Sequence, residues 1–572
     1  MDHVSFAYQA SENPTSAVLN NLSLSINEGE FVALIGQNGS GKSTLGKLLN
    51  ALIIPDRGNV FIGGLDTQES ANHPAIRRTI GMVFQRPQNQ IVATTVSEDI
   101  AFGPGNLGLP AKEIYQRVNG ALEVTGLTGF EERPSYLLSA GETQRLALAG
   151  VLAMHPKCII FDETTAMLDP FGREMVMQQA RALNKKGITI IFITHLMEEA
   201  AQAERVLVLD RGQIVMDDSP AEVFSSSSRV RSFGLDLPPV ALAAERMRKY
   251  FSSIPNNILQ IDDLLRYLPV CSSIKMERDL VKQKKNANQL CIEVENLSHI
   301  YLRGTPLAHQ SLDQCSLRVA EGTAHGLIGA TGSGKSTLLQ HLNGLITPQS
   351  GKVKVLGHSL NDPHIDIKVL RKSIGLAFQQ PEDQIFEQYV GDEIAFAVRN
   401  FAIPGKISEI VQSAMEAVGL DFIAFKDRLT STLSGGERRK VALASVLAGQ
   451  PQVLLLDEPL AGLDPISRNE LTTHLAELKN DGITLIISTH QFEGTIELLD
   501  EISVMVKGKD LVHGSPGIIF SDASNMEASG LKAPLVACIV KQLRDLKWPI
   551  STEVITLSEL ETSLSSIFGG KR

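Results

Sequence analysis

A duplicated glycine-rich loop constrains the fold of this chain more than any other feature. The segment Gly36–Ser43 reads GQNGSGKS, and Gly329–Ser336 repeats it as GATGSGKS 293 residues later. Four further pairs recur at offsets of 293 to 295 residues: Tyr8 and Tyr301, Gln85 and Gln379, Asp162 and Asp457, His195 and His490. Solenoid repeats have periods of ~20–50 residues, so each copy is predicted to be a whole domain.

Apolar runs around each loop predict an α/β fold with a mainly parallel sheet. Uninterrupted runs at 31–35, 158–161, 188–193, 327–328, 453–456 and 483–487 are typical of parallel strands that are buried on both faces. After the first loop, leucines at helical spacing predict a helix: Leu45, Leu48, Leu49 and Leu52. We therefore expect strand, phosphate loop and helix in succession, twice. The predicted domains are 1–230 and 289–520.

Each predicted domain is followed by an extension, over 231–288 and 521–572. Apolar residues lie on one helical face of each extension: Val240, Ala243, Ala244 and Met247, then Val536, Ile539, Val540 and Leu543. These faces suit either intramolecular packing or a dimer contact. The polar, basic segment 275–288 is interpreted as a solvated linker rather than a nucleic-acid patch.

Composition limits the classes of binding partner and the cellular location that we expect for this chain. The formal net charge of −11 disfavours phosphate-rich partners, so no nucleic acid is expected. Five scattered cysteines, none in metal-binding pairs, fit reduced thiols without disulfides or zinc. The apolar runs are shorter than the ~18–20 residues that span a bilayer, and the N-terminus lacks a secretion signal. We expect an intracellular protein with no membrane span of its own.

The duplicated loop has the GxxxxGKS pattern that binds nucleotide phosphates. Its glycines let backbone N–H groups converge on phosphate, its lysine reaches the β and γ oxygens, and its serine hydroxyl binds Mg²⁺. Lys42 and Lys335 take the first role, and Ser43 and Ser336 the second. The predicted ATP-binding residues are Gly36, Gln37, Asn38, Gly39, Ser40, Gly41, Lys42, Ser43 and Thr44, with Gly329, Ala330, Thr331, Gly332, Ser333, Gly334, Lys335, Ser336 and Thr337.

Paired carboxylates follow one apolar run in each copy, as Asp162-Glu163 and Asp457-Glu458. Open α/β sheets bind ligands at the carboxyl ends of their strands. There the aspartate can hold Mg²⁺ and the glutamate can orient or deprotonate an attacking water. Glu163 and Glu458 are the predicted bases. His195 and His490 follow the next run as Thr-His, where each can contact the γ-phosphate.

Two further segments reveal a family resemblance. Leu138–Glu142 (LSAGE) and Leu433–Glu437 (LSGGE) resemble the signature loop of ATP-binding-cassette (ABC) ATPases, which are P-loop NTPases. The resemblance implies a helical subdomain in each domain, and it implies Q-loop glutamines that join the Mg²⁺ site, Gln85 and Gln379. It also makes Asp169 and Asp464 the D-loop aspartates and His195 and His490 the switch histidines.

The resemblance also implies that the two cassettes pair head to tail within one chain. Ser434 and Gly436 would cap the ATP held by Lys42, and Ser139 and Gly141 the ATP held by Lys335. A helix N-terminus carries partial positive charge that suits a γ-phosphate. Tyr8 and Tyr301 stand where the family stacks an aromatic ring on adenine, although edge-strand packing explains them nearly as well. Both glutamates are present, so we expect hydrolysis at both sites.

This sequence departs from the pattern at Ala140, where glycine is usual, and at Thr164, where the second copy has Pro459. We expect the extra methyl of Ala140 to slow the site built on Lys335.

The segments 84–91 and 378–385, with the runs that follow them, resemble the ATPases of energy-coupling-factor (ECF) importers. That resemblance implies a transmembrane coupling subunit, a substrate-binding membrane subunit and a place at the cytoplasmic face of the cell membrane. Ile91, Val92, Ile385 and Phe386 would then line a groove for the coupling subunit, or alternatively belong to the core. Two rivals remain: a fused sugar-importer ATPase, and a double-cassette ATPase that acts on ribosomes.

Overall fold

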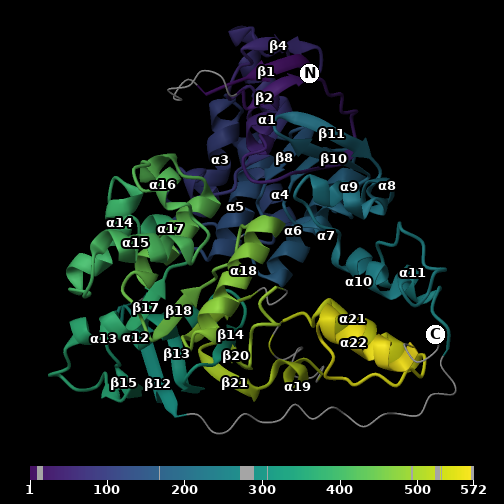
Figure 1. Cartoon of the computed structure of the whole chain (residues 1–572). Helices are drawn as coiled ribbons and strands as arrows, with labels where there is room; N and C mark the ends of the chain where they lie inside the picture. The colour runs from purple at the N-terminus through teal and green to yellow at the C-terminus, as the bar shows by residue number, and fades with distance from the viewer. Residues whose placement is uncertain are drawn as a thin grey trace. The chain divides into compact units, whose positions relative to one another are not determined.

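The computed structural model describes residues 1–8, 17–166, 168–270, 289–305, 307–490, 494–521, 529 and 531–568. The chain divides into two compact units, Met1–Arg266 and Tyr267–Arg572 (Figure 1). The duplicated loop accordingly belongs to two separate compact bodies. The predicted linker at 275–288 lies outside the described residues, and the finer bounds at 231 and 521 remain predictions.

The first unit is built on a six-stranded sheet with the order β11-β10-β3-β9-β8-β7. Its strands are β3 (Phe31–Ile35), β7 (Ile80–Val83), β8 (Cys158–Asp162), β9 (Thr189–Ile193), β10 (Arg205–Asp210) and β11 (Gln213–Asp218). All neighbours pair in parallel except β10 and β11, which are antiparallel. Strands β3, β8 and β9 are buried along their whole length, as uninterrupted apolar runs require.

The second unit repeats this sheet in the order β17-β18-β19-β14-β20-β21. Its strands are β14 (Ala324–Ile328), β17 (Ile374–Ala377), β18 (Val453–Asp457), β19 (Thr484–Thr489), β20 (Glu501–Val506) and β21 (Lys509–Gly514). Only the pair β20 and β21 is antiparallel among these six strands. The predicted α/β class with a mainly parallel sheet in each half is confirmed.

Each unit adds a small antiparallel sheet, with the orders β2-β1-β4 and β13-β12-β15-β16, and the first unit adds the pair β5-β6. These strands are β1 (Asp2–Phe6), β2 (Leu19–Leu22), β4 (Arg57–Asn59), β5 (Phe61–Ile62), β6 (Leu65–Asp66), β12 (Leu290–Tyr301), β13 (His309–Ala320), β15 (Ser350–Val355) and β16 (His358–Ser359).

Helices cover the sheets and form a separate packed group in each unit. In the first unit they are α1 (Lys42–Leu49), α2 (His73–Thr79), α3 (Val96–Asn106), α4 (Ala111–Thr125), α5 (Ala140–Ala153), α6 (Pro170–Lys185), α7 (Met197–Ala200), α8 (Pro220–Ser225), α9 (Ser227–Ser232), α10 (Pro239–Arg248) and α11 (Ile261–Leu265). In the second they are α12 (Lys335–Leu342), α13 (Ile367–Ser373), α14 (Val390–Asn400), α15 (Ile407–Glu416), α16 (Phe422–Phe425), α17 (Gly435–Leu447), α18 (Pro465–Asn480), α19 (Pro516–Ser521), α21 (Leu535–Asp545) and α22 (Leu557–Phe568). Helices α3, α4 and α5 pack on one another around their own apolar cluster, which is the helical subdomain that the family resemblance implied.

The helix after the first loop is one turn shorter than predicted. Leu45, Leu48 and Leu49 are buried, but α1 ends at Leu49 and Leu52 is 42% exposed. Asn50 caps the helix and donates to the Ile80 carbonyl, and Ala51 has a φ of 52°. The left-handed residue stops the helical repeat, so the prediction for Leu52 was wrong.

The predicted extension helices are present as α10 and α21. Ala243, Ala244 and Met247 are buried and Val240 is half-buried, while all four predicted residues of α21 are buried. Their apolar faces therefore pack inside the described structure. None of the described helices is long and apolar enough to cross a membrane. The four described cysteines are free thiols; Cys271 lies outside the described residues.

Candidate nucleotide-binding site

The glycine-rich loop connects a buried strand to a helix in both units. β3 leads to α1, and β14 leads to α12. The residue before each helix, Gly41 or Gly334, has a φ above 100°. A Cβ at Gly41 would lie 2.8 Å from Leu19 Cδ2, and one at Gly334 would lie 2.6 Å from the Ser311 carbonyl oxygen. Backbone conformation and close approach therefore both require glycine there.

The loop lysine is buried within its own loop. Lys42 Nζ donates to the carbonyl oxygens of Gly36 at 2.8 Å and Gln37 at 2.9 Å. Lys335 Nζ repeats this with Gly329 at 2.7 Å and Ala330 at 3.1 Å. The ammonium groups stand 3.8 Å from Glu163 and 3.9 Å from Glu458. The fold thus brings together the predicted phosphate-binding lysine and the predicted base.

The loop serine and the strand-end aspartate also meet. Ser43 Oγ donates to Asp162 Oδ1 at 2.8 Å. Burial raises the pKa of the Asp162 carboxyl, and the Ser43 hydrogen bond offsets part of that rise. Burial likewise raises the pKa of Asp457, against hydrogen bonds from Ser488 and Ser336. A hydroxyl beside a buried carboxylate fits Mg²⁺, which prefers oxygen ligands and whose charge stabilises the ionised acid.

The two predicted bases share an unusual backbone conformation. Glu163 has a φ of 48° and Glu458 a φ of 50°, in the left-handed region that glutamate rarely adopts. Their amides donate across the sheet to the carbonyls of Ile193 at 3.0 Å and Ser488 at 3.1 Å. A non-glycine residue in this backbone conformation reduces the stability of the folded state by about 1–3 kcal/mol, and such strained residues are concentrated at functional sites.

The carboxylates of the two bases have different partners. Gln85 Nε2 donates to Glu163 Oε2 at 2.8 Å, whereas His490 Nδ1 lies 2.7 Å from Glu458 Oε1. Burial alone would raise the pKa of Glu458, but the hydrogen bond and charge of His490 together with Lys335 hold it below its ordinary range. The structure therefore places the Q-loop glutamine on one base and the switch histidine on the other. His195 is buried two residues after the end of β9.

The two tyrosines occupy equivalent positions beside the loop helix. Tyr8 and Tyr301 hydrogen-bond the hydroxyls of Thr44 and Thr337, both at 3.3 Å. The two tyrosine residues are 44% and 37% exposed, and Tyr8 also packs edge-on against Phe6 with ring centroids 5.0 Å apart. Both readings of these residues, adenine stacking and edge-strand packing, are compatible with this arrangement.

The signature loops open two capped helices. Ser139 precedes α5 and Ser434 precedes α17, and each forms a capping box, with Glu142 and Glu437 respectively. Ser139 and Ser434 are exposed. In both units the predicted phosphate-capping serine therefore lies at the N-terminus of a helix and is exposed to solvent. The D-loop aspartates cap the helices α6 and α18.

Sequence reasoning missed two residues that connect these loops, the half-buried Arg439 and the buried Glu199. Arg439, on α17, donates to the Gln379 carbonyl at 3.0 Å and the Pro459 carbonyl at 2.9 Å. Glu199, at the position that Gly494 takes in the second unit, accepts from Thr165 at 3.0 Å and Thr194 at 2.5 Å. Three of these four contacts join residues that are 20 to 60 positions apart in the sequence, so no local pattern predicts them.

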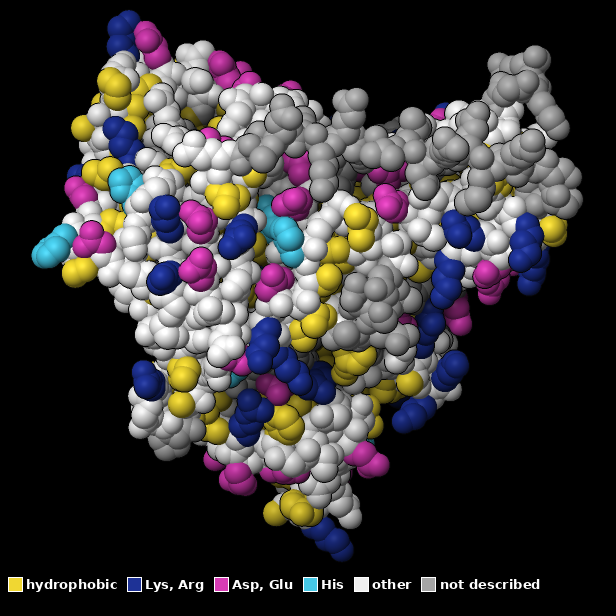
Figure 2. Space-filling model, turned by 90° about the horizontal axis from the view of Figure 1, so that it is seen from below, with side chains coloured by type: hydrophobic (Ala, Val, Ile, Leu, Met, Phe, Trp, Pro, Cys, Tyr) yellow, Lys and Arg dark blue, Asp and Glu magenta, His cyan; other side chains and the backbone are white. Residues whose placement is uncertain are grey.

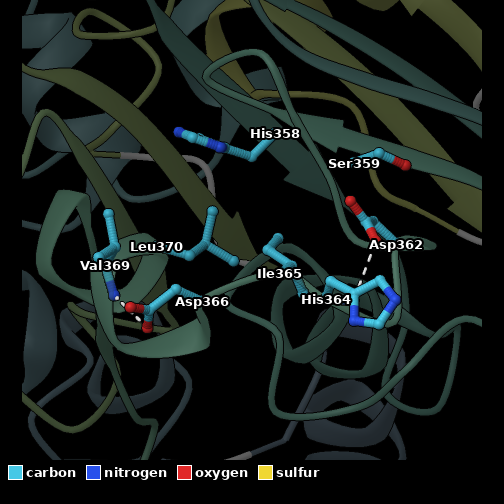
Figure 3. A pocket seen from close by; sticks show the side chains of 8 residues that line it. All are labelled: His358, Ser359, Asp362, His364, Ile365, Asp366, Val369 and Leu370. Atoms are coloured by element: carbon cyan, nitrogen blue, oxygen red, sulfur yellow. Dashed lines mark hydrogen bonds between the residues drawn. The ribbon is translucent and has the colours of Figure 1, made fainter.

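A pocket of about 260 Å³ in the second unit lies elsewhere (Figure 3). It is lined from β16 and α13 and by the segment between them, and none of the predicted nucleotide-site residues lines it. The side chains of His358 and His364 point in different directions in it (Figure 3).

Comparison with known proteins finds a matching family, sequence relatives and a similar solved structure. The family model described as "ABC transporter" matches residues 19–166 and 312–461. A Methanosarcina acetivorans protein, provisionally named as an ABC transporter ATP-binding protein, is 33% identical over 99% of this chain and 93% of its own length. The energy-coupling factor transporter ATP-binding protein EcfA1 of Clostridium perfringens is 48% identical over 46% of this chain and 94% of its own length. The solved structure of cbiO1 from the same organism is 30% identical, with a TM-score of 0.38, and covers 45% of this chain and 99% of its own.

ATP hydrolysis is the general activity of the family whose model matches both halves. The two matched segments and the near full-length similarity show that this chain belongs to the ABC transporter family, as an ATPase with two cassettes.

Proposed function

We propose that this chain is the energy-coupling ATPase of an importer that resembles the ECF type, with two ATP sites that drive transport through membrane subunits. The similarity to EcfA1 over almost its whole length supports the ECF assignment. The observation that carries the membrane partner is a pair of exposed apolar side chains at matched positions after the two Q-loops.

These side chains are held in place by buried carboxylates. The amides of Val92 and Ala93 donate to Asp99 Oδ1 at 2.7 and 3.0 Å. In the second unit the amides of Phe386 and Glu387 donate to Glu393 Oε2 at 3.0 and 2.8 Å. Both carboxylates are buried, so the backbone of each loop is held in place by hydrogen bonds to a buried side chain.

The fixed loops nevertheless present apolar groups to water. Val92 is 61% exposed and Phe386 is 64% exposed, whereas Ile91 and Ile385 are half-buried against the core. The core interpretation is therefore right for the isoleucines and wrong for Val92 and Phe386. Phe386 also packs edge-on against Phe396, which is 41% exposed. A rigid exposed apolar patch suits a partner that supplies an apolar helix.

We assign the chemistry to the residues that the loops bring together. Lys42 and Lys335 bind the β and γ oxygens, and Ser43, Asp162 and Gln85, with Ser336, Asp457 and Gln379, would hold Mg²⁺, which neutralises phosphate charge when bound. Glu163 or Glu458 orients the attacking water and accepts its proton as the water oxygen bonds to the γ-phosphorus and the bond to ADP breaks. His195 and His490 contact the γ-phosphate.

We further propose that each site is completed by the signature serine and glycine of the opposite cassette. Ser139 and Gly141, or Ser434 and Gly436, present a helix N-terminus to solvent in each unit, which is a suitable anion partner. A chain with two cassettes carries both halves of two such sites.

Fractionation of the producing cells tests the membrane assignment. The unaltered chain is expected with the membrane fraction, and a Val92→Asp/Phe386→Asp variant in the unsedimented fraction, because a charge in each apolar patch opposes docking. Ile423→Asp is the matched control, since Ile423 is a 75% exposed apolar side chain on α16, outside both Q-loop segments in the sequence. ATP turnover of the purified variants checks that the sites remain intact.

Two results would contradict the proposal: membrane association of the double variant equal to that of the unaltered chain, or sedimentation of the unaltered chain with ribosomes. Ribosome association is the result that the translation-factor rival requires. On the face drawn in Figure 2, Lys and Arg side chains are interleaved with Asp and Glu, whereas an RNA-binding face concentrates positive charge.

A further inference from the structure

A cluster of two histidines, a glutamate and a serine lies on the sheet of the second unit, away from the nucleotide loops. His325 is on β14, Glu501 and Ser503 are on β20, and His513 is on β21. His325 pairs with Glu501, and Ser503 pairs with His513 in the strand register. β14 enters the phosphate loop only after Ile328, so the cluster is at the opposite ends of these parallel strands from that loop.

The side chains converge. His325 and His513 stack with ring centroids 5.4 Å apart and an interplanar angle of 14°. Glu501 Oε2 lies 4.0 Å from His325 Nδ1 and 3.6 Å from His513 Nε2. One ligand atom from each residue lies within 4.8 Å of the other two.

The hydrogen bonds of Ser503 leave an electrostatic conflict at this point. Its hydroxyl is 3.1 Å from His325 Nε2 and 3.3 Å from His513 Nδ1, and it has one proton to donate. If the serine donates its hydrogen bond to one neutral ring, the nitrogen of that ring that faces the serine is an acceptor. The ring proton is then on its other nitrogen, which faces Glu501. The other neutral ring donates to the serine and presents a bare lone pair to the carboxylate.

A cation between the rings and the carboxylate removes the conflict. His325 Nδ1 is buried and makes no hydrogen bond, and the side chain is only 1% exposed. A metal ion accepts the lone pairs of neutral imidazoles directly.

The first unit has different side chains at the positions that correspond to this cluster. The positions that correspond to Glu501 and His513 are Arg205 and Asp217, by the same strand register. There the guanidinium binds the carboxylate at 2.6 and 2.7 Å, with Val32 in place of His325. An ion pair of fixed charge joins the two strands in the first unit, whereas the second unit has two imidazoles and a carboxylate at the corresponding positions.

We propose that His325, Glu501 and His513 bind a zinc-type divalent transition-metal ion that fastens β21 to β20 and β14. Two imidazoles and a carboxylate suit Zn²⁺ or Co²⁺, with a water in the fourth position. Ligand atoms around a tetrahedral ion stand about 3.4 Å apart for bonds of 2.0–2.1 Å. Glu501 and His513 are 50% and 41% exposed, so their side chains can make the small inward movement while His325 stays fixed. Ser503 acts as the outer partner that orients both rings.

Metal titration of the untagged, chelator-treated full chain tests the proposal. We expect one Co²⁺ per chain with the visible d–d absorption of four-coordinate cobalt, displaced by Zn²⁺. His513→Ala and Glu501→Gln should weaken Zn²⁺ binding at least 100-fold. His364→Ala should leave it unchanged, because His364 is an exposed histidine beside Asp362 in the same unit (Figure 3).

Circular dichroism and ATP turnover show whether the ligand variants are folded, since these residues are remote from the phosphate loop. Absence of a tight Zn²⁺ equivalent in the unaltered chain would overturn the proposal. Equal Zn²⁺ affinity in folded His513→Ala, or octahedral Co²⁺ absorption alone, would do the same.

Discussion

Replacement of Glu199 by glutamine is expected to stabilise the first unit, and by more at neutral and alkaline pH than at acidic pH. Glu199 is 3% exposed and accepts hydrogen bonds from Thr165 and Thr194, near the charge of Arg173. Burial outweighs these contacts and raises the pKa of the carboxyl from 4.5 to about 7. The folded protein therefore binds this proton more strongly than the unfolded chain does.

The magnitude follows from linkage. A rise of the pKa from 4.5 to about 7 corresponds to about 3 kcal/mol between the two protonation states. A raised carboxyl pKa favours folding at low pH. The penalty grows as the pH rises from 4.5 to 7 and is complete above pH 7. Glutamine has no proton to lose, so Glu199→Gln should gain about 3 kcal/mol at pH 8 and about 1 kcal/mol at pH 5.

Urea unfolding of the full chain measures this gain. Hydrogen exchange of peptides from β8 and β9 reports the unfolding of the first unit separately. For a slope of about 3 kcal/mol per molar urea, the midpoint should rise by about 1 M at pH 8 and about 0.3 M at pH 5. Glu198→Gln removes the same charge from a half-buried neighbour and should shift the midpoint little at either pH. An equal gain at both pH values, or a loss at pH 8, would refute the reasoning.

Two further predictions concern the loops themselves. Ser434→Arg should stop turnover at the site built on Lys42, which loses its phosphate cap, and so at least halve total ATP turnover. The exposed control Ser431→Arg should not, and equal rates for Ser434→Arg and the unaltered chain would contradict the composite site. Gly332→Ala should cost the second unit about 1 kcal/mol, because its φ is 80° but a Cβ would meet nothing within 4 Å. Gly334→Ala adds a contact of 2.6 Å with the Ser311 carbonyl and should cost about 3 kcal/mol or more, so equal urea midpoints would contradict the steric argument.

Much of the fold was predictable because the relevant signals are local. The uninterrupted apolar runs at 31–35 and 158–161 became β3 and the buried strand β8, since only a sheet covered on both faces buries every residue of such a run. The loop glycines and lysines were predictable for the same reason. The helix end at Leu49 was missed because Ala51 adopts a left-handed conformation that alanine does not usually signal.

Contacts between distant segments could not be predicted in this way. Arg439 reads as one basic residue on an amphipathic helix until the fold brings the Gln379 and Pro459 carbonyls to it. Burial lowers the pKa of its guanidinium to about 10, which reflects the cost of placing a charge there. Val92 and Phe386 posed the opposite problem, because an exposed apolar residue and a core residue look the same in a sequence.

The two units differ in the contacts that support the loops, while the loops themselves are nearly identical. Both lysines make the same two carbonyl contacts, and both bases have a left-handed φ near 50°. A shift of even 1 Å at such atoms would misplace the phosphate, so few arrangements are acceptable. A contact whose only role is to join two strands can be an ion pair in one unit and a histidine cluster in the other. Several kinds of side-chain interaction can hold two strands at the same separation. The duplication therefore separates the two kinds of residue: what the halves share is the candidate catalytic apparatus, and what they do not share, including His325 and Glu199, is where the halves can differ in stability and control.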